Sequence, residues 1–318
     1  MAPGTGLVEF AERFPDRFFD VGIAEGHAAC FAAGLAIEGI RPYLTVYSTF
    51  MQRAYDQVIH DIALQNLPVV ICMDRAGLVG EDGPTHHGTF DLAYLSSVPN
   101  LTLAAPKDGN ELRSMLHYTI ENDLTGAVAI RYPRDTVPTE MTKDITPIDW
   151  GKWELQTEPT EIALLAVGSM VDCALMAQEE LSKKGIDVSV TNARFVRPLD
   201  LDSLDRVAAQ AKVIITVEEG QLAGGFGQKV AAHLMSTGFG GRFKAVGIPD
   251  QFVTYGHRSI LLRELGLDTE GIVRLVDEIG SGKPAKNGRF FSKLRFRRSE
   301  HSKPKEGAAS ADLFTGNE

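Results

Sequence analysis

Short apolar runs alternate with longer amphipathic stretches through the first half of the chain. Four of the runs predict buried strands, at residues 43–47, 68–73, 101–105 and 127–131. Stretches with helical spacing of apolar positions lie between or after them, at residues 50–65, 91–96 and 108–122. Continuous apolar strands that alternate with amphipathic helices are typical of a parallel sheet covered on both faces. The pattern predicts an α/β domain over residues 1–140.

The same alternation returns in the second half of the chain. It predicts strands at residues 162–167, 187–192, 213–218 and 244–247, and helices at residues 170–184, 201–211, 224–236 and 259–265. A polar stretch rich in Pro and Thr, residues 141–160, separates the two halves and is expected to be a linker or an extended arm. The predicted fold class is therefore α/β, with two doubly wound, mainly parallel-sheet domains, the second ending near residue 280.

Residues 281–318 differ from the rest because basic side chains crowd them. We expect a solvated, disordered tail. The alternative is an electrostatic contact with an acidic partner or RNA, for which Phe290, Phe291 and Phe296 among the basic residues are the main argument.

Composition narrows the protein class. The formal net charge of −10 argues against nucleic acid as the main partner. No apolar run approaches the ~20 residues of a membrane helix, and the first residues lack the features of a signal peptide. Three cysteines without CxxC spacing, Cys30, Cys72 and Cys173, suggest reduced thiols that fill core space in a cytoplasmic protein.

Glu25 is the first candidate site residue, within Asp-Val-Gly-Ile-Ala-Glu-Gly-His at residues 20–27. It stands between an apolar, strand-like run at residues 18–23 and an Ala/Gly-rich, helix-like stretch at residues 28–37. An enzyme can bury such a lone acid to hold a proton on a ligand nitrogen. Taken alone, a glutamate at a helix start is more often a cap or a partner of the helix dipole.

Further candidates follow predicted strands. Tyr47-Ser-Thr-Phe50 lies where a strand enters a helix, which is where α/β proteins place ligands. Arg75 follows the next strand and offers a planar cation suited to phosphate. A Gly-rich turn in the second half, at residues 224–227, precedes a helix and is weaker evidence for a phosphate site.

A loop bounded by Gly and Pro, residues 80–88, carries several titratable side chains. Asp82, His86 and His87 are the main ones. Metal binding is the rival interpretation of these side chains, but adjacent histidines point in different directions in most backbones, and no third histidine follows at metal spacing. No metal site is therefore predicted in this sequence.

In their order and spacing, residues 20–27, 47–61 and 74–88 resemble the pyrimidine-binding half of thiamine-diphosphate enzymes, most closely the 1-deoxy-D-xylulose-5-phosphate synthases. The resemblance covers roughly residues 1–280. It implies a pyrimidine-binding domain, N-terminally incomplete, followed by a domain like the C-terminal domain of transketolase. It also implies thiamine diphosphate as cofactor and a homodimer.

The resemblance also implies roles for individual residues. Glu25 matches the glutamate that hydrogen-bonds the aminopyrimidine ring and promotes loss of the C2 proton, and Phe50 would stack on that ring. His86 matches a histidine that handles protons near the reacting carbonyl. The substrate and its phosphate would be held by Tyr47, Arg75, Asp82 and Arg134.

This sequence departs from the family at two positions next to these residues. Gly26 stands where the family commonly has Gln, which is expected to change packing more than cofactor activation. His87 stands where the family often has Gln, so no catalytic role is expected for it.

The family's diphosphate site is the missing part. It uses a Gly-Asp-Gly motif and a downstream Asn to hold Mg²⁺ and the diphosphate, and this sequence has no such constellation. We therefore expect the Mg²⁺ ligands in an N-terminal domain and the chain alone to be inactive, as part of a split enzyme, a processed product or a shortened form.

The complete enzyme would condense pyruvate with glyceraldehyde 3-phosphate with loss of CO₂, for isoprenoid, thiamine and pyridoxal precursors. A separate subunit that supplies the N-terminal domain is one expected partner, and neither a membrane nor nucleic acid is expected as a partner. One alternative is a β-type subunit of another thiamine enzyme, a transketolase or a 2-oxoacid dehydrogenase. The other is a non-catalytic homologue that acts as a scaffold.

Overall fold

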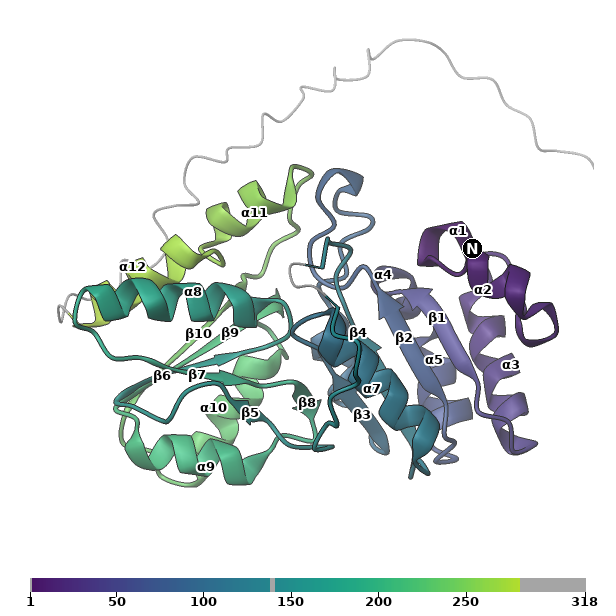
Figure 1. Ribbon diagram of the computed structural model, residues 1–318, viewed down its shortest axis with the longest axis horizontal. Coiled ribbons are helices and arrows are strands. Elements are labelled where there is room, and N and C mark those ends of the chain that lie inside the picture. Colours follow the sequence, from purple (N-terminus) through teal and green to yellow (C-terminus); the bar gives the residue numbers. More distant parts are fainter. Residues whose placement is uncertain (1, 138–140, 281–318) are drawn as a thin grey trace, which may run out of the picture.

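Two five-stranded sheets, each covered by helices, lie side by side in the computed structural model (Figure 1). The structure describes residues 2–137 and 141–280, so the expected basic tail at residues 281–318 lies outside the described residues. Both sheets are mainly parallel, which confirms the predicted fold class.

The first sheet is built mainly from the strands predicted in the first half of the chain. Four parallel strands follow the order β1 (Tyr43–Tyr47), β2 (Val70–Asp74), β4 (Ala127–Arg131) and β3 (Leu101–Ala104). β2 and β4 are central and buried at every residue, which explains why they are continuously apolar except at their ends. A fifth strand, β8 (Phe195–Arg197), pairs antiparallel with β3 and comes from the second half of the sequence. The hydrophobic pattern did not predict it.

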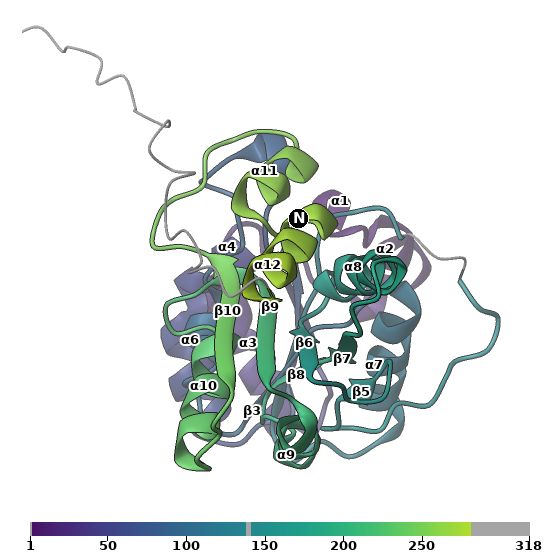
Figure 2. The same cartoon turned by 90° about the vertical axis from the view of Figure 1, so that its left-hand side faces the viewer.

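Helices cover both faces of this sheet. α7 (Gly109–Glu121) lies on one face, and α3 (Glu25–Ile37) lies on the other (Figure 2). The helix predicted at residues 50–65 is a chain of short turns, α4 (Ser48–Met51), η2 (Gln52–Ala54), α5 (Tyr55–Gln57) and the π-helical η3 (Val58–Ala63). The predicted helix at residues 91–96 is α6 (Asp91–Leu95). Three short helical segments precede α3: α1 (Ala2–Thr5), α2 (Val8–Arg13) and η1 (Pro15–Arg17).

The strand-like run at residues 18–23 was wrongly interpreted as part of a strand. The segment pairs with no strand of the described chain, and both Phe19 and Ile23 are exposed. Gly22 has φ of +70°, which interrupts an extended conformation. Glu25 is therefore reached through a loop and not from a strand.

The second sheet follows the predicted strands and gains one more. Its order is β10 (Arg242–Ile248), β9 (Val213–Gln221), β6 (Ile162–Ala166), β7 (Ser189–Asn192) and β5 (Glu154–Leu155). β5 pairs antiparallel with β7, so part of the expected linker at residues 141–160 belongs to this sheet. α8 (Met170–Lys183) and α12 (Thr269–Gly280) cover one face, and α9 (Leu201–Gln210) and α10 (Phe226–Ser236) cover the other (Figure 1). α11 (Arg258–Leu265) precedes α12.

The two sheets are joined by a shared interior. β7 ends at Asn192 in the second sheet and β8 begins at Phe195 in the first. Between them, Arg194 donates to the buried carboxylate of Glu111 on α7 at 3.2 Å, and Asn192 donates to the same carboxylate at 2.9 Å. Phe195 is fully buried in a cluster that contains residues of both domains. Because packed interiors resist rearrangement, the shared cluster fixes one domain against the other.

The cysteines follow the sequence prediction only in part. Cys72 is buried in β2, and burial raises the pKa of its thiol to about 12. Cys30 is exposed on α3, and its thiol donates a hydrogen bond to Asp61 at 3.4 Å. The expectation that Cys30 fills core space is therefore wrong, because it lies on the solvent face of an otherwise Ala-rich helix.

Candidate active site

The carboxyl ends of β1 and β2 are at the same end of the molecule as α1, η4 (Gly80–Asp82) and α11 (Figure 1, Figure 2). Parallel α/β sheets bind ligands at this edge because the loops that follow the strands converge there. Most of the predicted site residues are on these loops.

Glu25 is the first residue of α3, and 8% of its surface is exposed. The rest of α3 lets the helix approach η2 and η3 closely, because its buried side chains are small. They are Ala28, Ala29, Ala32, Ala33 and Ala36. Arg53, on η2, donates from Nη1 to Glu25 Oε1 at 2.8 Å. The carboxylate is thus oriented by an arginine from a neighbouring element and not by a cap on its own helix.

Arg53 also connects Glu25 to the aromatic residues of the site. Its Cζ lies 4.6 Å from the centroid of the Phe50 ring, a cation–π contact. The Arg53 side chain is 54% exposed, so it can turn toward solvent once another hydrogen-bond partner reaches Glu25. Arg53 thus contacts both Glu25 and Phe50.

Three rings, those of Tyr47, Phe50 and His86, form a row of contacts next to Arg53, the partner of Glu25. Tyr47 and Phe50 are stacked with centroids 5.5 Å apart, and the edge of His86 meets Phe50 at 5.3 Å. Tyr47 is buried, and Phe50 is half-buried. His86 Nδ1 shares a hydrogen bond of 2.9 Å with the Thr85 hydroxyl. The structure therefore brings together Tyr47, Phe50 and His86, which the sequence assigned to one site.

Arg75 occupies the other side of Tyr47. Its Cζ lies 3.7 Å from the Tyr47 ring centroid, and its Nη1 donates to Asp74 at 2.6 Å and to the Gly4 carbonyl of α1 at 2.7 Å. The backbone of Arg75 has φ of +59°, a left-handed conformation that is rare for such a residue and that clusters at functional sites. Burial raises the pKa of Asp74, although the Arg75 and Arg134 guanidinium groups act in the opposite direction.

Asp82 and Arg134 form an ion pair at the protein surface. Arg134 Nη1 donates to Asp82 Oδ2 at 2.9 Å, and both side chains are exposed. Two of the four residues that were predicted to hold substrate, Asp82 and Arg134, are therefore partners of each other in the structure.

Two neighbouring residues have structural roles. The buried Arg131 donates to Asp91 at 2.9 Å and to the Glu219 carbonyl of the second domain at 3.1 Å. His87 is buried, its Nδ1 accepts from the Val79 amide at 3.1 Å, and its Nε2 contacts the Thr254 carbonyl at 3.0 Å. Because Nδ1 accepts, Nε2 carries the proton and donates it to Thr254.

The Gly-rich turn in the second domain is not free for phosphate. The amides of Phe226 and Gly227, at the start of α10, each donate to the buried carboxylate of Glu218 at 2.8 Å. The protein's own acid thus takes the place that an anion would have at this helix start.

No metal centre is formed within residues 2–137 and 141–280, where no three His, Cys, Asp or Glu side chains are placed to hold an ion. In the same part of the chain, no helix is both long and apolar enough to cross a membrane.

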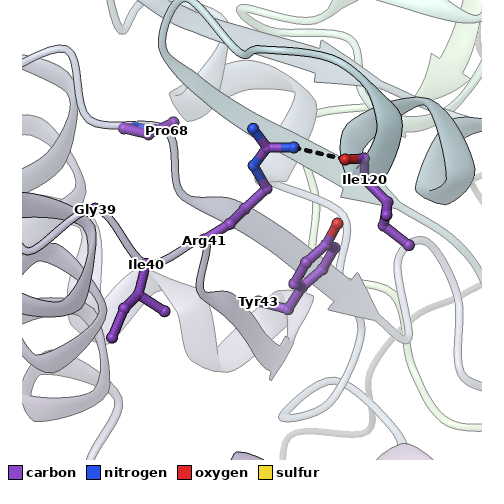
Figure 3. Close-up of a pocket in the computed structure, with 6 residues that line it drawn as sticks. All are labelled: Gly39, Ile40, Arg41, Tyr43, Pro68 and Ile120. Carbon is purple, nitrogen blue, oxygen red and sulfur yellow. Dashed lines mark hydrogen bonds between the residues drawn. The ribbon is translucent and has the colours of Figure 1, made fainter.

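A surface pocket of about 410 Å³ lies elsewhere, at the opposite end of the first sheet. Figure 3 shows Arg41 and Tyr43 in it, with Arg41 reaching the Ile120 carbonyl at the end of α7. Arg41 also donates to the Thr119 carbonyl at 2.6 Å, so its cation is used to cap α7. Since this pocket contains none of the predicted site residues, we assign no chemistry to it.

Comparison with known proteins agrees with the fold. Residues 1–140 match the transketolase pyrimidine-binding domain family, and residues 151–272 match the transketolase C-terminal domain family.

The chain is similar to curated 1-deoxy-D-xylulose-5-phosphate synthases. It is 52% identical to the one of Chlorobium phaeovibrioides over 87% of this chain and 44% of that protein. It is 51% identical to the one of Aquifex aeolicus over 89% of this chain and 45% of that protein. The chain thus spans somewhat less than half the length of these relatives.

Solved structures share the architecture. A protein described as a split gene transketolase, an inactive β4 tetramer, superposes with a TM-score of 0.77 at 29% identity, covering 88% of this chain and 89% of that one. A transketolase from Campylobacter jejuni superposes with a TM-score of 0.67 at 19% identity, over 82% of this chain and 39% of that one, which shows the shared fold alone.

Proposed function

The chain belongs to the transketolase family, and on that premise we propose that it contributes the pyrimidine-binding and C-terminal domains of a 1-deoxy-D-xylulose-5-phosphate synthase. The complete enzyme would condense pyruvate with glyceraldehyde 3-phosphate and release CO₂, with thiamine diphosphate as cofactor. The identity of about 50% to proteins of that name is the main support for this choice within the family.

The observation that carries the proposal is the grouping of Glu25, Phe50 and His86 through Arg53. A buried carboxylate, an aromatic face and an imidazole lie within a single chain of contacts. A scaffold protein has no need of this constellation. The residues fit the pyrimidine ring of thiamine diphosphate, because a carboxylate can share a proton with a ring nitrogen while an aromatic ring stacks on the base.

When bound, thiamine diphosphate supplies the nucleophilic carbon that attacks the keto group. Glu25 would hold a proton at the aminopyrimidine, a position that Arg53 occupies as hydrogen-bond partner in this structure. Phe50 would fix the plane of the ring. His86, at the edge of Phe50, would donate or accept the proton of the reacting carbonyl oxygen.

The aldehyde's phosphate would be held by Tyr47, Arg75 and Arg134, with Asp82 next to the substrate. The Nε of Arg75 is a buried donor with no hydrogen-bond partner among the described residues. A buried unpaired donor is costly, and a phosphate oxygen is the type of acceptor that an arginine donor binds most strongly. This unpaired donor supports Arg75 as the residue that binds phosphate.

The diphosphate and Mg²⁺ would be bound outside the two domains described, in an N-terminal domain that belongs to the same polypeptide or to a second subunit. A separate subunit has a specific precedent, since the split gene transketolase with a similar fold is described as inactive in its β4 form. A β-type subunit of another thiamine enzyme is therefore the second candidate.

We also propose a homodimer and a cytoplasmic location. Five large apolar side chains on or next to α3 and η3, two elements that contact each other, are exposed: Phe19, Ile23, Ile37, Ile59 and Leu64. Exposed apolar surface favours association. All three cysteines are free, as is usual in a reducing compartment. Light scattering at micromolar concentration tests the dimer, and a monodisperse monomer would contradict it.

Reconstitution tests the proposed activity. The chain is assayed with thiamine diphosphate, Mg²⁺, pyruvate and glyceraldehyde 3-phosphate, alone and with the part of the Chlorobium phaeovibrioides relative that it does not match. We expect CO₂ release and product only in the mixture. Turnover of ketose phosphates without pyruvate would favour a transketolase. The absence of activity with either set of substrates would favour the scaffold.

A further inference from the structure

The loop that carries Asp82 and His86 is closed at its base by two glycines. The Gly77 amide donates to the Gly88 carbonyl at 2.7 Å, and the Gly88 amide donates to the Gly77 carbonyl at 2.8 Å. Both side-chain positions are crowded: a Cβ on Gly77 would lie 2.6 Å from Glu219 Cδ, and one on Gly88 would lie 2.4 Å from the Arg75 carbonyl oxygen. The base of the loop is thus packed directly against the second domain.

Glu219, on β9 of the second domain, is the centre of that contact. Its side chain is 1% exposed. Oε1 accepts from the Leu78 amide at 2.9 Å and from Arg258 Nε at 3.1 Å, while Oε2 accepts from Ser169 at 3.1 Å and from Arg258 Nη2 at 2.5 Å. Four donors from three segments therefore converge on one carboxylate.

Arg258 extends the connection to the other side of the site. Its Nη1 donates to Asp135 Oδ2 at 2.8 Å. Asp135 adjoins Arg134, which pairs with Asp82 on the loop. The Glu219–Arg258 pair thus links the base of the loop, through Leu78, to the segment that carries Arg134.

Other backbone groups of the second domain hold the same loop. The Thr254 carbonyl accepts from His87, the Gly256 amide donates to the Gly80 carbonyl at 3.4 Å, and the Gln221 amide donates to the Thr89 carbonyl at 2.8 Å. The loop is therefore attached to the second domain on both sides of Asp82 and His86.

We infer that Glu219 is a positioning residue for the reaction, and that the C-terminal domain holds the loop of Asp82 and His86 in its working geometry through the Glu219–Arg258 pair. This inference rests on the proposed function, in which those two side chains act on substrate. A shift of about 1 Å in a reacting group can lower a rate about 100-fold, so a rigid attachment of the loop has a direct effect on turnover.

The adjacent Glu218 provides a matched control. It is buried on the same strand, but its carboxylate accepts from Phe226 and Gly227 of its own domain. Glu219→Gln and Glu218→Gln therefore make the same substitution at consecutive buried residues, and only the first change removes an acceptor of the loop.

Hydrogen exchange by mass spectrometry on the 318-residue chain gives a readout that does not depend on activity. For Glu219→Gln we expect the peptide spanning residues 76–90 to exchange about tenfold faster, because the Leu78 amide loses a charged acceptor. Glu218→Gln should leave that peptide unchanged. Unchanged protection in Glu219→Gln, or equal loss in both variants, would overturn the inference.

The reconstituted enzyme gives the second readout. Glu219→Gln should lower kcat about 10–100-fold while the Kd for thiamine diphosphate stays within about twofold, because the loop and not the cofactor contact is disturbed. An unchanged kcat would overturn the inference. If Glu219→Gln does not fold, Arg258→Lys carries both tests, since it keeps the buried charge but loses the two-point contact. An inactive wild-type reconstitution would refute the proposed function, whereas the exchange comparison would still decide whether Glu219 holds the loop.

Discussion

The Arg53 guanidinium donates to the Glu25 carboxylate at 2.8 Å while it lies 4.6 Å from the centre of the Phe50 ring. One side chain thus joins the two residues assigned to the cofactor's pyrimidine ring. Glu25 is buried and Arg53 is half-exposed, so Arg53 is the partner that can move. We interpret Arg53 as orienting the Glu25 carboxylate until a nitrogen of the cofactor's pyrimidine ring replaces Arg53 as its hydrogen-bond partner.

Arg134→Ala should weaken binding of the aldehyde phosphate with little effect on stability. The Asp82–Arg134 pair is exposed, and exposed pairs contribute about 0–1 kcal/mol. Loss of a charged donor to phosphate should raise the KM for glyceraldehyde 3-phosphate about 10–100-fold. Steady-state kinetics of the reconstituted enzyme measures this. Arg206→Ala, which breaks the exposed pair with Glu158, is the matched control and should leave KM unchanged.

Substitution of the adjacent residues His86 and His87 should have different effects, one on kcat and the other on stability. His87→Ala removes bonds to Val79 and Thr254 in a buried place and should lower the free energy of unfolding by about 1–3 kcal/mol. His86→Ala removes only a bond to the Thr85 hydroxyl and a ring contact, so its main effect should be on kcat, by about 10²–10⁴-fold. Chemical denaturation together with kinetics checks both. Equal stability losses in the two variants would contradict the assigned roles.

The hydrophobic pattern predicted most of the strands because the central strands are buried on both faces and are continuously apolar over most of their length. The predicted ranges 43–47 and 127–131 coincide with β1 and β4, and the others differ from the observed strands by a few residues at their ends. β8 was missed because three residues carry no period, and its pairing with Leu103 and Ala104 is a long-range contact. α12 was missed although its buried face follows a helical period.

The candidate site was predicted residue by residue but not in its connections. The sequence placed Glu25, Phe50 and His86 together only through a family resemblance, and the structure brings them into one chain of contacts. Nothing in the local pattern indicates that Glu219 accepts from Leu78, since these residues are 141 positions apart. Contacts between domains depend on how the sheets pack, which no local period encodes.

Glu218 should make stability depend on pH. Burial raises the pKa of its carboxyl from 4.5 to about 7, although the amides of Gly227 and Phe226 act in the opposite direction. An acid whose pKa is higher in the folded state than in the unfolded state makes its full contribution to the free energy of unfolding at pH values below the pKa of the unfolded state. This stabilisation is lost as pH rises from about 4.5 through about 7, and the loss is on the order of 3 kcal/mol.

Urea denaturation at pH 5 and pH 8 measures this effect. The free energy of unfolding of Glu218→Gln minus that of wild type should be larger at pH 8 than at pH 5, because the amide does not ionise. A difference between the two proteins that is independent of pH would show that Glu218 does not titrate in this range.

The central claim is that Glu25 holds a proton at the cofactor's pyrimidine ring. Its most direct test is the rate of C2 proton exchange of thiamine diphosphate on the reconstituted enzyme, followed by NMR for wild type, Glu25→Ala and Arg134→Ala. We predict that Glu25→Ala lowers the exchange rate about 10²–10⁴-fold with the fold intact, and that Arg134→Ala leaves it unchanged. If Glu25 only begins a helix, Glu25→Ala will instead exchange at the wild-type rate and lose about 0.5–2 kcal/mol of stability, and that result would contradict the account.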